Sequence, residues 1–180
     1  MNLHELSPAP GSNPKAYRKA VALLAESEFI DIFGVENSLT PAMDLFTKLG
    51  YLGLTCRLNT DAYLQQIGAG HLPHGAVAVA FSHSGSSADT VKALRLAKSH
   101  GAKTIAITNA IGAPLASWAD VTLLTGRDSH TIYGNAIFSR VADTALVDML
   151  YMGVILSDYG RFSTALDESG RMIRDRVFEN

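Results

Sequence analysis

Apolar residues along the chain fall into two recurring patterns, short uncharged runs and longer segments with apolar positions three or four residues apart. The short runs fit strands that are buried on both faces, and the longer segments fit amphipathic helices. The expected strands are 29–33, 54–58, 76–81, 103–108 and 121–124. The expected helices are 14–24, 39–49, 61–68, 91–98, 115–118, 135–157 and 161–177.

Strands that alternate with helices over most of the chain predict a mainly parallel sheet covered on both faces, which is a three-layer α/β/α sandwich. In such sheets a ligand lies beyond the carboxyl ends of the strands, where the strand order reverses. Three loops leave strand ends in this arrangement, namely 34–38, 82–87 and 108–112. We therefore expect a ligand site to be assembled from these loops.

The loop after the third expected strand is rich in hydroxyl groups. It reads Ser82-His83-Ser84-Gly85-Ser86-Ser87 and leads directly into a helix. Backbone N–H groups at a helix N-terminus point outward, and the helix dipole adds partial positive charge, so such a loop favours an anion such as a phosphate. Serine hydroxyls can donate to the same anion, and glycine lets the backbone approach it. The alternative is that Ser86 or Ser87 only caps the helix.

Length and composition fit one globular domain. The chain has 180 residues, of which 47% are hydrophobic and 18% are charged. This is enough for a sizeable core and argues against intrinsic disorder. Residues 1–13 include Pro8 and Pro10 and are expected to form a flexible leader or an interdomain linker, so that 14–180 is the single domain.

Charge, cysteine content and hydropathy exclude several classes of protein. The net charge is −2 and the basic residues are scattered, so this chain alone is not expected to bind nucleic acid. The single Cys56 excludes an internal disulfide and fits a reducing compartment. We find neither a secretory leader nor an apolar run long enough to cross a bilayer. The sequence therefore predicts a soluble, cytoplasmic protein without membrane contact.

The segment 135–157 is apolar around most of its circumference when drawn as a helix. Such a helix either lies in the core of its own chain or is shared with a partner subunit. In a chain of this size we favour a dimer interface, with Leu146 and Leu150 as contacts whose truncation would lower the oligomer mass. Burial within the monomer is the alternative.

Five motifs follow one another along the chain. They are IFGVENS at 32–38, FSHSGSS at 81–87, GAKTIAITN at 101–109, PLASWAD at 114–120 and FSRVADTALVDML at 138–150. Together they resemble the sugar isomerase (SIS) domain, and the last resembles the long helix in the effector domains of RpiR-type bacterial transcription regulators. The resemblance covers about residues 13–156. It implies a five-stranded parallel sheet of flavodoxin-like architecture, a phosphorylated sugar as ligand, and a homodimer or homotetramer.

The resemblance also implies which residues meet the ligand. Carried over by position, the residues that contact the phosphate are Ser82, His83, Ser84 and Ser87. Asn37 and Ser38 fall in the loop that faces the sugar or the phosphate from the first strand. Glu36 stands where the family commonly has glycine or serine, and a carboxylate there opposes an anion unless it points at the sugar hydroxyls. Many isomerases of the family have glutamate at the position of Ser86.

An isomerase that moves a carbonyl along a sugar needs a base with a pKa near the working pH. The candidates are Glu36, Asp61, His71, His83, Asp128 and His130. Asp61 stands where a helix N-cap is needed, and orienting a phosphate is the simpler role for His83. No recognisable catalytic pair emerges, so the catalytic residues stay unassigned. The histidine spacing gives no metal site, and no cofactor is expected.

Two functions stay open. The first is a phosphosugar-sensing domain of the RpiR type, whose ligand shifts an oligomer or a DNA-binding partner domain. Such regulators carry an N-terminal helix-turn-helix segment that this sequence lacks, so we expect an isolated effector domain or a stand-alone relative. The second is an aldose–ketose phosphosugar isomerase. The sensor predicts saturable binding without turnover, whereas the isomerase predicts proton exchange at the carbon next to the carbonyl.

Overall fold

The computed structural model describes residues 13–126 and 140–174 of the chain. Its elements are α1 (Pro14–Glu26), β1 (Ile30–Phe33), η1 (Glu36–Ser38), α2 (Leu39–Tyr51), β2 (Cys56–Leu58), α3 (Ala62–Ala69), β3 (Val77–Phe81), α4 (Ala88–Ser99), β4 (Lys103–Thr108), η2 (Pro114–Trp118), β5 (Val121–Leu124), α5 (Val141–Ser157) and α6 (Tyr159–Met172). The expected elements are all present, with shifted ends; η1 and η2 are short 3₁₀ helices.

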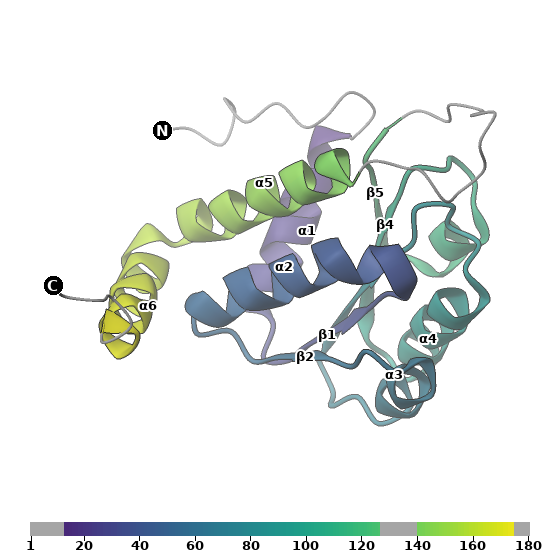
Figure 1. Cartoon of the computed structure of the whole chain (residues 1–180), viewed down its shortest axis with the longest axis horizontal. Helices are drawn as coiled ribbons and strands as arrows, with labels where there is room; N and C mark the ends of the chain where they lie inside the picture. Colours follow the sequence, from purple (N-terminus) through teal and green to yellow (C-terminus); the bar gives the residue numbers. More distant parts are fainter. Residues whose placement is uncertain (1–12, 127–139, 175–180) are drawn as a thin grey trace, which may run out of the picture.

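The strands form one parallel sheet in the order β2-β1-β3-β4-β5 (Figure 1). Helices α1, α2 and α5 cover one face of the sheet, and α3 and α4 cover the other. The side chains of β3 show how the two faces differ. Val79 and Phe81 face the first group of helices, whereas Ala78 and Ala80 face α4, which presents small residues of its own. The predicted α/β/α sandwich with a five-stranded parallel sheet is thus confirmed.

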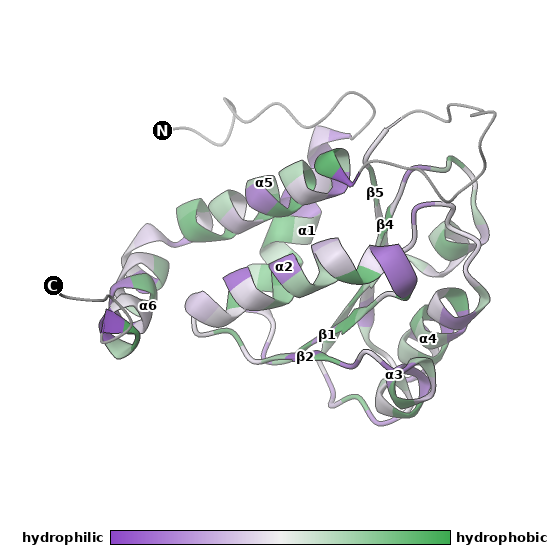
Figure 2. Cartoon of the chain, in the orientation of Figure 1, coloured by the Kyte–Doolittle hydropathy of each residue, from purple (hydrophilic) through white to green (hydrophobic). Residues whose placement is uncertain are grey.

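Helix α5 is the apolar helix of the sequence analysis, but it begins later than expected. Its first residue is Val141, and residues 135–139 lie outside the described ranges. Apolar residues, green in Figure 2, occupy much of its length. Leu146 and Leu150 are fully buried, and the helix packs on α1 and α2. Our assignment of these leucines to a subunit interface was therefore wrong, because both belong to the monomer core.

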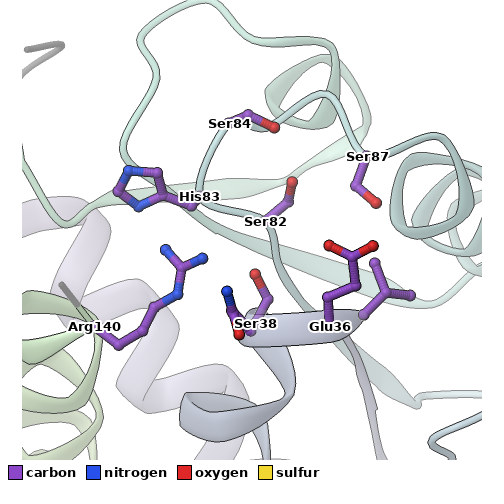
Figure 3. A pocket seen from close by; sticks show the side chains of 9 residues that line it. Glu36, Ser38, Ser82, His83, Ser84, Ser87 and Arg140 are labelled. Atoms are coloured by element: carbon purple, nitrogen blue, oxygen red, sulfur yellow. The ribbon is translucent and has the colours of Figure 1, made fainter. Parts of the chain in front are cut away.

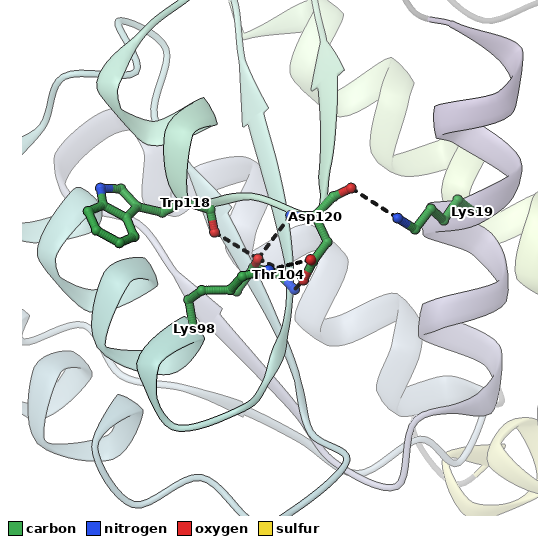
Figure 4. A network of polar contacts seen from close by, with 5 residues as sticks. All are labelled: Lys19, Lys98, Thr104, Trp118 and Asp120. Atoms are coloured by element: carbon green, nitrogen blue, oxygen red, sulfur yellow. Dashed lines mark hydrogen bonds and ion pairs between the residues drawn. The ribbon is translucent and has the colours of Figure 1, made fainter.

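A polar network at the start of β5 ties four elements together (Figure 4). The Asp120 carboxylate pairs with Lys98 of α4 and accepts a hydrogen bond from the Thr104 N–H of β4 at 2.9 Å. The Asp120 carbonyl accepts another from Nζ of Lys19 in α1 at 3.1 Å. Burial by itself raises the pKa of the Asp120 carboxyl, but the Lys98 ammonium and the Thr104 N–H outweigh it, so the pKa is lowered.

In residues 13–126 and 140–174, no helix combines the length and the apolar character needed to cross a membrane.

Candidate functional site

The candidate site lies where the strand order reverses. β2 and β3 flank β1 on opposite sides, so the loops that follow β1 and β3 diverge at the carboxyl edge of the sheet. Between them lies a cleft of about 370 Å³ (Figure 3). Its lining residues are Val35, Glu36, Asn37, Ser38, Ser82, His83, Ser84, Ser87 and Arg140. All six residues that the sequence analysis assigned to the ligand line this cleft, and their role in binding stays a prediction.

Gly85 gives the serine loop its shape. Its φ is +62°, in the left-handed region, and its N–H donates to the Ser82 carbonyl at 3.0 Å to close a tight turn. A Cβ at this position would lie 2.3 Å from Cβ of Ala113 and 2.8 Å from Oγ1 of Thr108. The Gly85 carbonyl in turn accepts from the Leu115 N–H at 2.9 Å. The loop is therefore held between β4 and η2, and only glycine fits at its turn.

The serine hydroxyls of this loop are not used as helix caps. Ser87 occupies the N-cap position of α4, yet its side chain makes no capping hydrogen bond. Among the described residues, its Oγ accepts only a long bond from the Thr90 hydroxyl at 3.4 Å, which leaves its own proton available toward the cleft. The first-turn N–H groups of α4 have no partner within the helix. The alternative that Ser87 serves only to cap α4 is thus not supported.

The loop after β4 supports the site without lining the cleft. The His83 carbonyl accepts hydrogen bonds from the Asn109 N–H at 3.0 Å and from the Thr108 hydroxyl at 3.1 Å. Nδ2 of Asn109 lies 3.5 Å from Nε2 of His83. The candidate loop 108–112 therefore contacts His83 and does not line the cleft, and any part of it in binding stays a prediction.

The first loop is fixed by a residue that the sequence analysis missed. The Gln65 side chain of α3 is 1% exposed and holds both backbone groups of Gly34. Its Oε1 accepts from the Gly34 N–H at 3.3 Å, and its Nε2 donates to the Gly34 carbonyl at 2.7 Å. Asp61 caps the same helix by accepting from the Leu64 N–H at 2.9 Å, as predicted. Asp61 thus serves α3 and does not line the cleft.

Glu36 enters the cleft from an uncommon backbone conformation. Its φ is +51°, the only positive φ of a non-glycine residue in the described part of the chain. The residue is exposed, and its carboxylate points across the cleft toward Ser82 and Ser87 (Figure 3). The left-handed region explains why glycine suits this position, and it means that the glutamate is held there against its backbone preference.

Arg140 is the second residue that the sequence analysis missed. It immediately precedes α5, its side chain is 17% exposed, and its guanidinium points into the cleft on the same side as His83 (Figure 3). Oδ2 of Asp143 lies 3.8 Å from Nη1, which is too far for a hydrogen bond. Among the described residues, Nε and Nη1 have no hydrogen-bond partner. Arg140 is the only basic residue in the apolar stretch 135–157, and this could have marked it as a candidate for an anion site.

The other candidate groups do not join the cleft. His71 and His74 are exposed on the turn before β3, and Asp128 and His130 lie outside the described residues. Burial raises the pKa of the Cys56 thiol to about 12, so this cysteine is no nucleophile at neutral pH. Within the described ranges, no three His, Cys, Asp or Glu side chains are arranged to hold a metal ion.

Comparison with known families shows to which family the chain belongs. The sequence model of the SIS domain matches residues 23–153. The chain belongs to the SIS domain family. A curated relative of this SIS domain is an uncharacterised HTH-type transcriptional regulator of Caldanaerobacter subterraneus subsp. tengcongensis, 30% identical over 168 residues. The match covers 93% of this chain and 60% of the relative, so the chain spans about three fifths of that regulator's length.

Solved structures share the fold of this SIS domain. The Vibrio vulnificus NanR protein complexed with ManNAc-6P superposes with a TM-score of 0.86 at 24% identity, over 98% of this chain and 65% of NanR. The sugar isomerase domain of an RpiR transcription factor from Sphaerobacter thermophilus gives a TM-score of 0.79 at 24% identity, over 89% of this chain and 88% of that domain.

Proposed function

We propose that this SIS domain binds a phosphorylated sugar and acts as the ligand-sensing module of an RpiR-type regulator or of a stand-alone relative. The observation that carries the proposal is the composition of the cleft. Hydroxyls of the serine loop, the N-terminus of α4 and the guanidinium of Arg140 all face one volume. A phosphate is the ligand group that satisfies these donors together.

The Arg140 side chain adds a specific reason to expect an anion. Within the described residues, Nε and Nη1 of this largely buried guanidinium have no hydrogen-bond partner, and donors that have lost water without gaining an acceptor are costly. A phosphate oxygen would supply the missing acceptors, and each hydrogen bond to a charged group contributes about 1.5–3 kcal/mol. The sugar would then extend toward Asn37 and Ser38 of η1, which line the same cleft.

The relatives support the sensing role and a cytoplasmic location. They include an HTH-type regulator, and the NanR structure holds ManNAc-6P. A homodimer or homotetramer is part of the proposal, and the outward side of α5 is the surface for it. Val141 is 75% exposed there and Met152 is 36% exposed. Because Arg140 lies at the start of this helix, a ligand that engages its guanidinium could alter how α5 meets a partner subunit or a DNA-binding domain.

The proposal is tested by calorimetry with a panel of hexose and pentose phosphates and their unphosphorylated sugars. We expect saturable binding of at least one sugar phosphate, no heat from the matching free sugar, and no turnover of the bound compound. Failure of every sugar phosphate to bind would overturn the proposal.

Phosphosugar isomerisation is the second candidate, and Glu36 is the observation that favours it. Its carboxylate lies in the cleft and could remove a proton next to a carbonyl. No second carboxylate of the described residues lines the cleft to assist ring opening. Deuterium uptake from solvent at the carbon next to the carbonyl would identify the isomerase, and bound sugar phosphate without uptake identifies the sensor.

A further inference from the structure

The cleft carries two opposite charges at separate places. The Arg140 guanidinium lies beside His83, whereas the Glu36 carboxylate faces Ser82 and Ser87 from the other side (Figure 3). A phosphate bound by the serine loop would therefore lie in the field of a negative charge that weakens its binding. A carboxylate in this position favours a ligand only if the ligand brings a compensating group.

The backbone indicates that the Glu36 side chain has a role. A left-handed φ costs a residue with a Cβ about 1–2 kcal/mol relative to glycine, so glycine would be both less strained and free of repulsion toward the phosphate. Strain of this kind is concentrated at active sites and ligand-binding sites. Among the described residues, no hydrogen bond or ion pair holds the Glu36 carboxylate, which faces the cleft.

We infer that Glu36 selects sugar phosphates that carry a free, positively charged amino group on the sugar. The inference rests on the proposed function, since it concerns the second end of the same ligand. Hydroxyl groups of an ordinary sugar phosphate can be met by the neutral side chains of Asn37 and Ser38. A cation is the ligand group that gains most from a carboxylate in place of an amide, because the ion pair adds attraction and offsets the repulsion of the phosphate.

The test compares three ligands that share one skeleton, glucosamine 6-phosphate, glucose 6-phosphate and N-acetylglucosamine 6-phosphate, at a pH where the free amine is charged. By calorimetry we expect the wild-type chain to bind the amine about tenfold more tightly than the other two, the scale of one charge-assisted contact. In Glu36→Gln, which keeps the shape and loses the charge, this preference should disappear, and glucose 6-phosphate should bind more tightly than it does to the wild type.

The control is Glu26→Gln, which removes an exposed carboxylate at the end of α1 and should leave the preference unchanged. Equal affinity of the wild type for the three ligands, or a tenfold preference that survives in Glu36→Gln, overturns the inference while leaving the proposed function intact. If none of these ligands and no other sugar phosphate binds either protein, the proposed function itself fails.

Discussion

Arg140 shows at the residue scale how a side chain can contribute to a site without contributing to the fold. Its guanidinium is largely buried, yet within the described ranges Nε and Nη1 make no hydrogen bond and the nearest carboxylate is 3.8 Å away. The fold therefore gains little from its charge. A bound phosphate would be stabilised by this positive charge, because the ion pair would form in a site largely shielded from bulk water.

We expect Arg140→Met to weaken sugar phosphate binding by about 1.5–3 kcal/mol, the value of a hydrogen bond to a charged group. The same change should alter the free energy of unfolding by less than about 1 kcal/mol, since methionine fills the space of the unpaired donors while the buried Asp143 loses only a 3.8 Å ion pair. Calorimetry and urea denaturation measure the two effects. Arg18→Met, at an exposed position of α1, is the control and should change neither. Unaltered affinity in Arg140→Met would remove the guanidinium from the site.

At this scale the sequence predicted those site residues that lie in loops with a local pattern. The serine loop was proposed because hydroxyl-rich residues directly follow a buried strand, whereas Asn37 and Ser38 were carried over from the resemblance to the SIS domain. Gln65 could not be found in this way, because its partner Gly34 is distant in the chain and the contact exists only in the folded sheet. Arg140 was hidden by a helix pattern that continued through it.

At the scale of elements, a small residue sets how closely α1 and α5 pack on each other. Gly153 of α5 lies against the Tyr17 ring, whose hydroxyl donates to the Met149 carbonyl at 2.6 Å. Burial raises the pKa of that hydroxyl to about 12, so the tyrosine remains a neutral donor. The small residue at 153 is what allows the two helices to meet around this hydrogen bond.

Gly153→Ala should therefore destabilise the fold by about 1–3 kcal/mol, although alanine is the better helix former. Its Cβ would lie 2.5 Å from the Tyr17 hydroxyl oxygen and 2.7 Å from Cγ2 of Val21. The matched control is Gly50→Ala in α2, where nothing lies within 4 Å, and there we expect up to about 1 kcal/mol of stabilisation. Urea denaturation measures both, and equal effects of the two substitutions would contradict the packing described for Gly153.

The sequence predicted which helices and strands are present better than it predicted where each one begins and ends or what each one packs against. β3 and α4 were predicted because an uncharged run and a helical repeat adjoin a serine-rich turn. The start of α5 was not predicted, because apolar residues continue upstream of Val141 in the sequence and do not show where the helix begins. Apolar content also could not distinguish a core helix from an interface helix, which is why Leu146 and Leu150 were misassigned.

At the scale of the whole molecule, the parallel order β2-β1-β3-β4-β5 places the cleft, and polar contacts around Asp120 fasten the far edge of the sheet. Because the pKa of the Asp120 carboxyl is lowered in the folded state, the stability that its contacts give to this edge depends on pH. Its stabilising contribution is complete above the unfolded-state pKa of about 3.9 and is lost as the pH falls through the lower pKa of the folded state.

We expect Asp120→Asn to lower the free energy of unfolding by about 1–3 kcal/mol at neutral pH, on the scale of a lost charged hydrogen bond. The difference from the wild type should shrink below about pH 4, where the wild-type carboxyl also takes up a proton. Urea denaturation at a series of pH values gives the curve. Asp167→Asn, on the exposed side of α6, should change the free energy by less than about 0.5 kcal/mol. A difference that is independent of pH would contradict the role given to Asp120.

The central claim is that the serine loop holds the phosphate of a sugar, and calorimetry of a loop variant tests it most directly. Replacing Ser84 and Ser87 together by alanine removes two cleft-lining hydroxyls, whereas Ser86→Ala alters a serine of the same loop that does not line the cleft. The account predicts a loss of about 2–4 kcal/mol in sugar phosphate binding for the double variant, roughly 30-fold to 1000-fold in Kd, and little change for Ser86→Ala. Wild-type affinity in the double variant would contradict it.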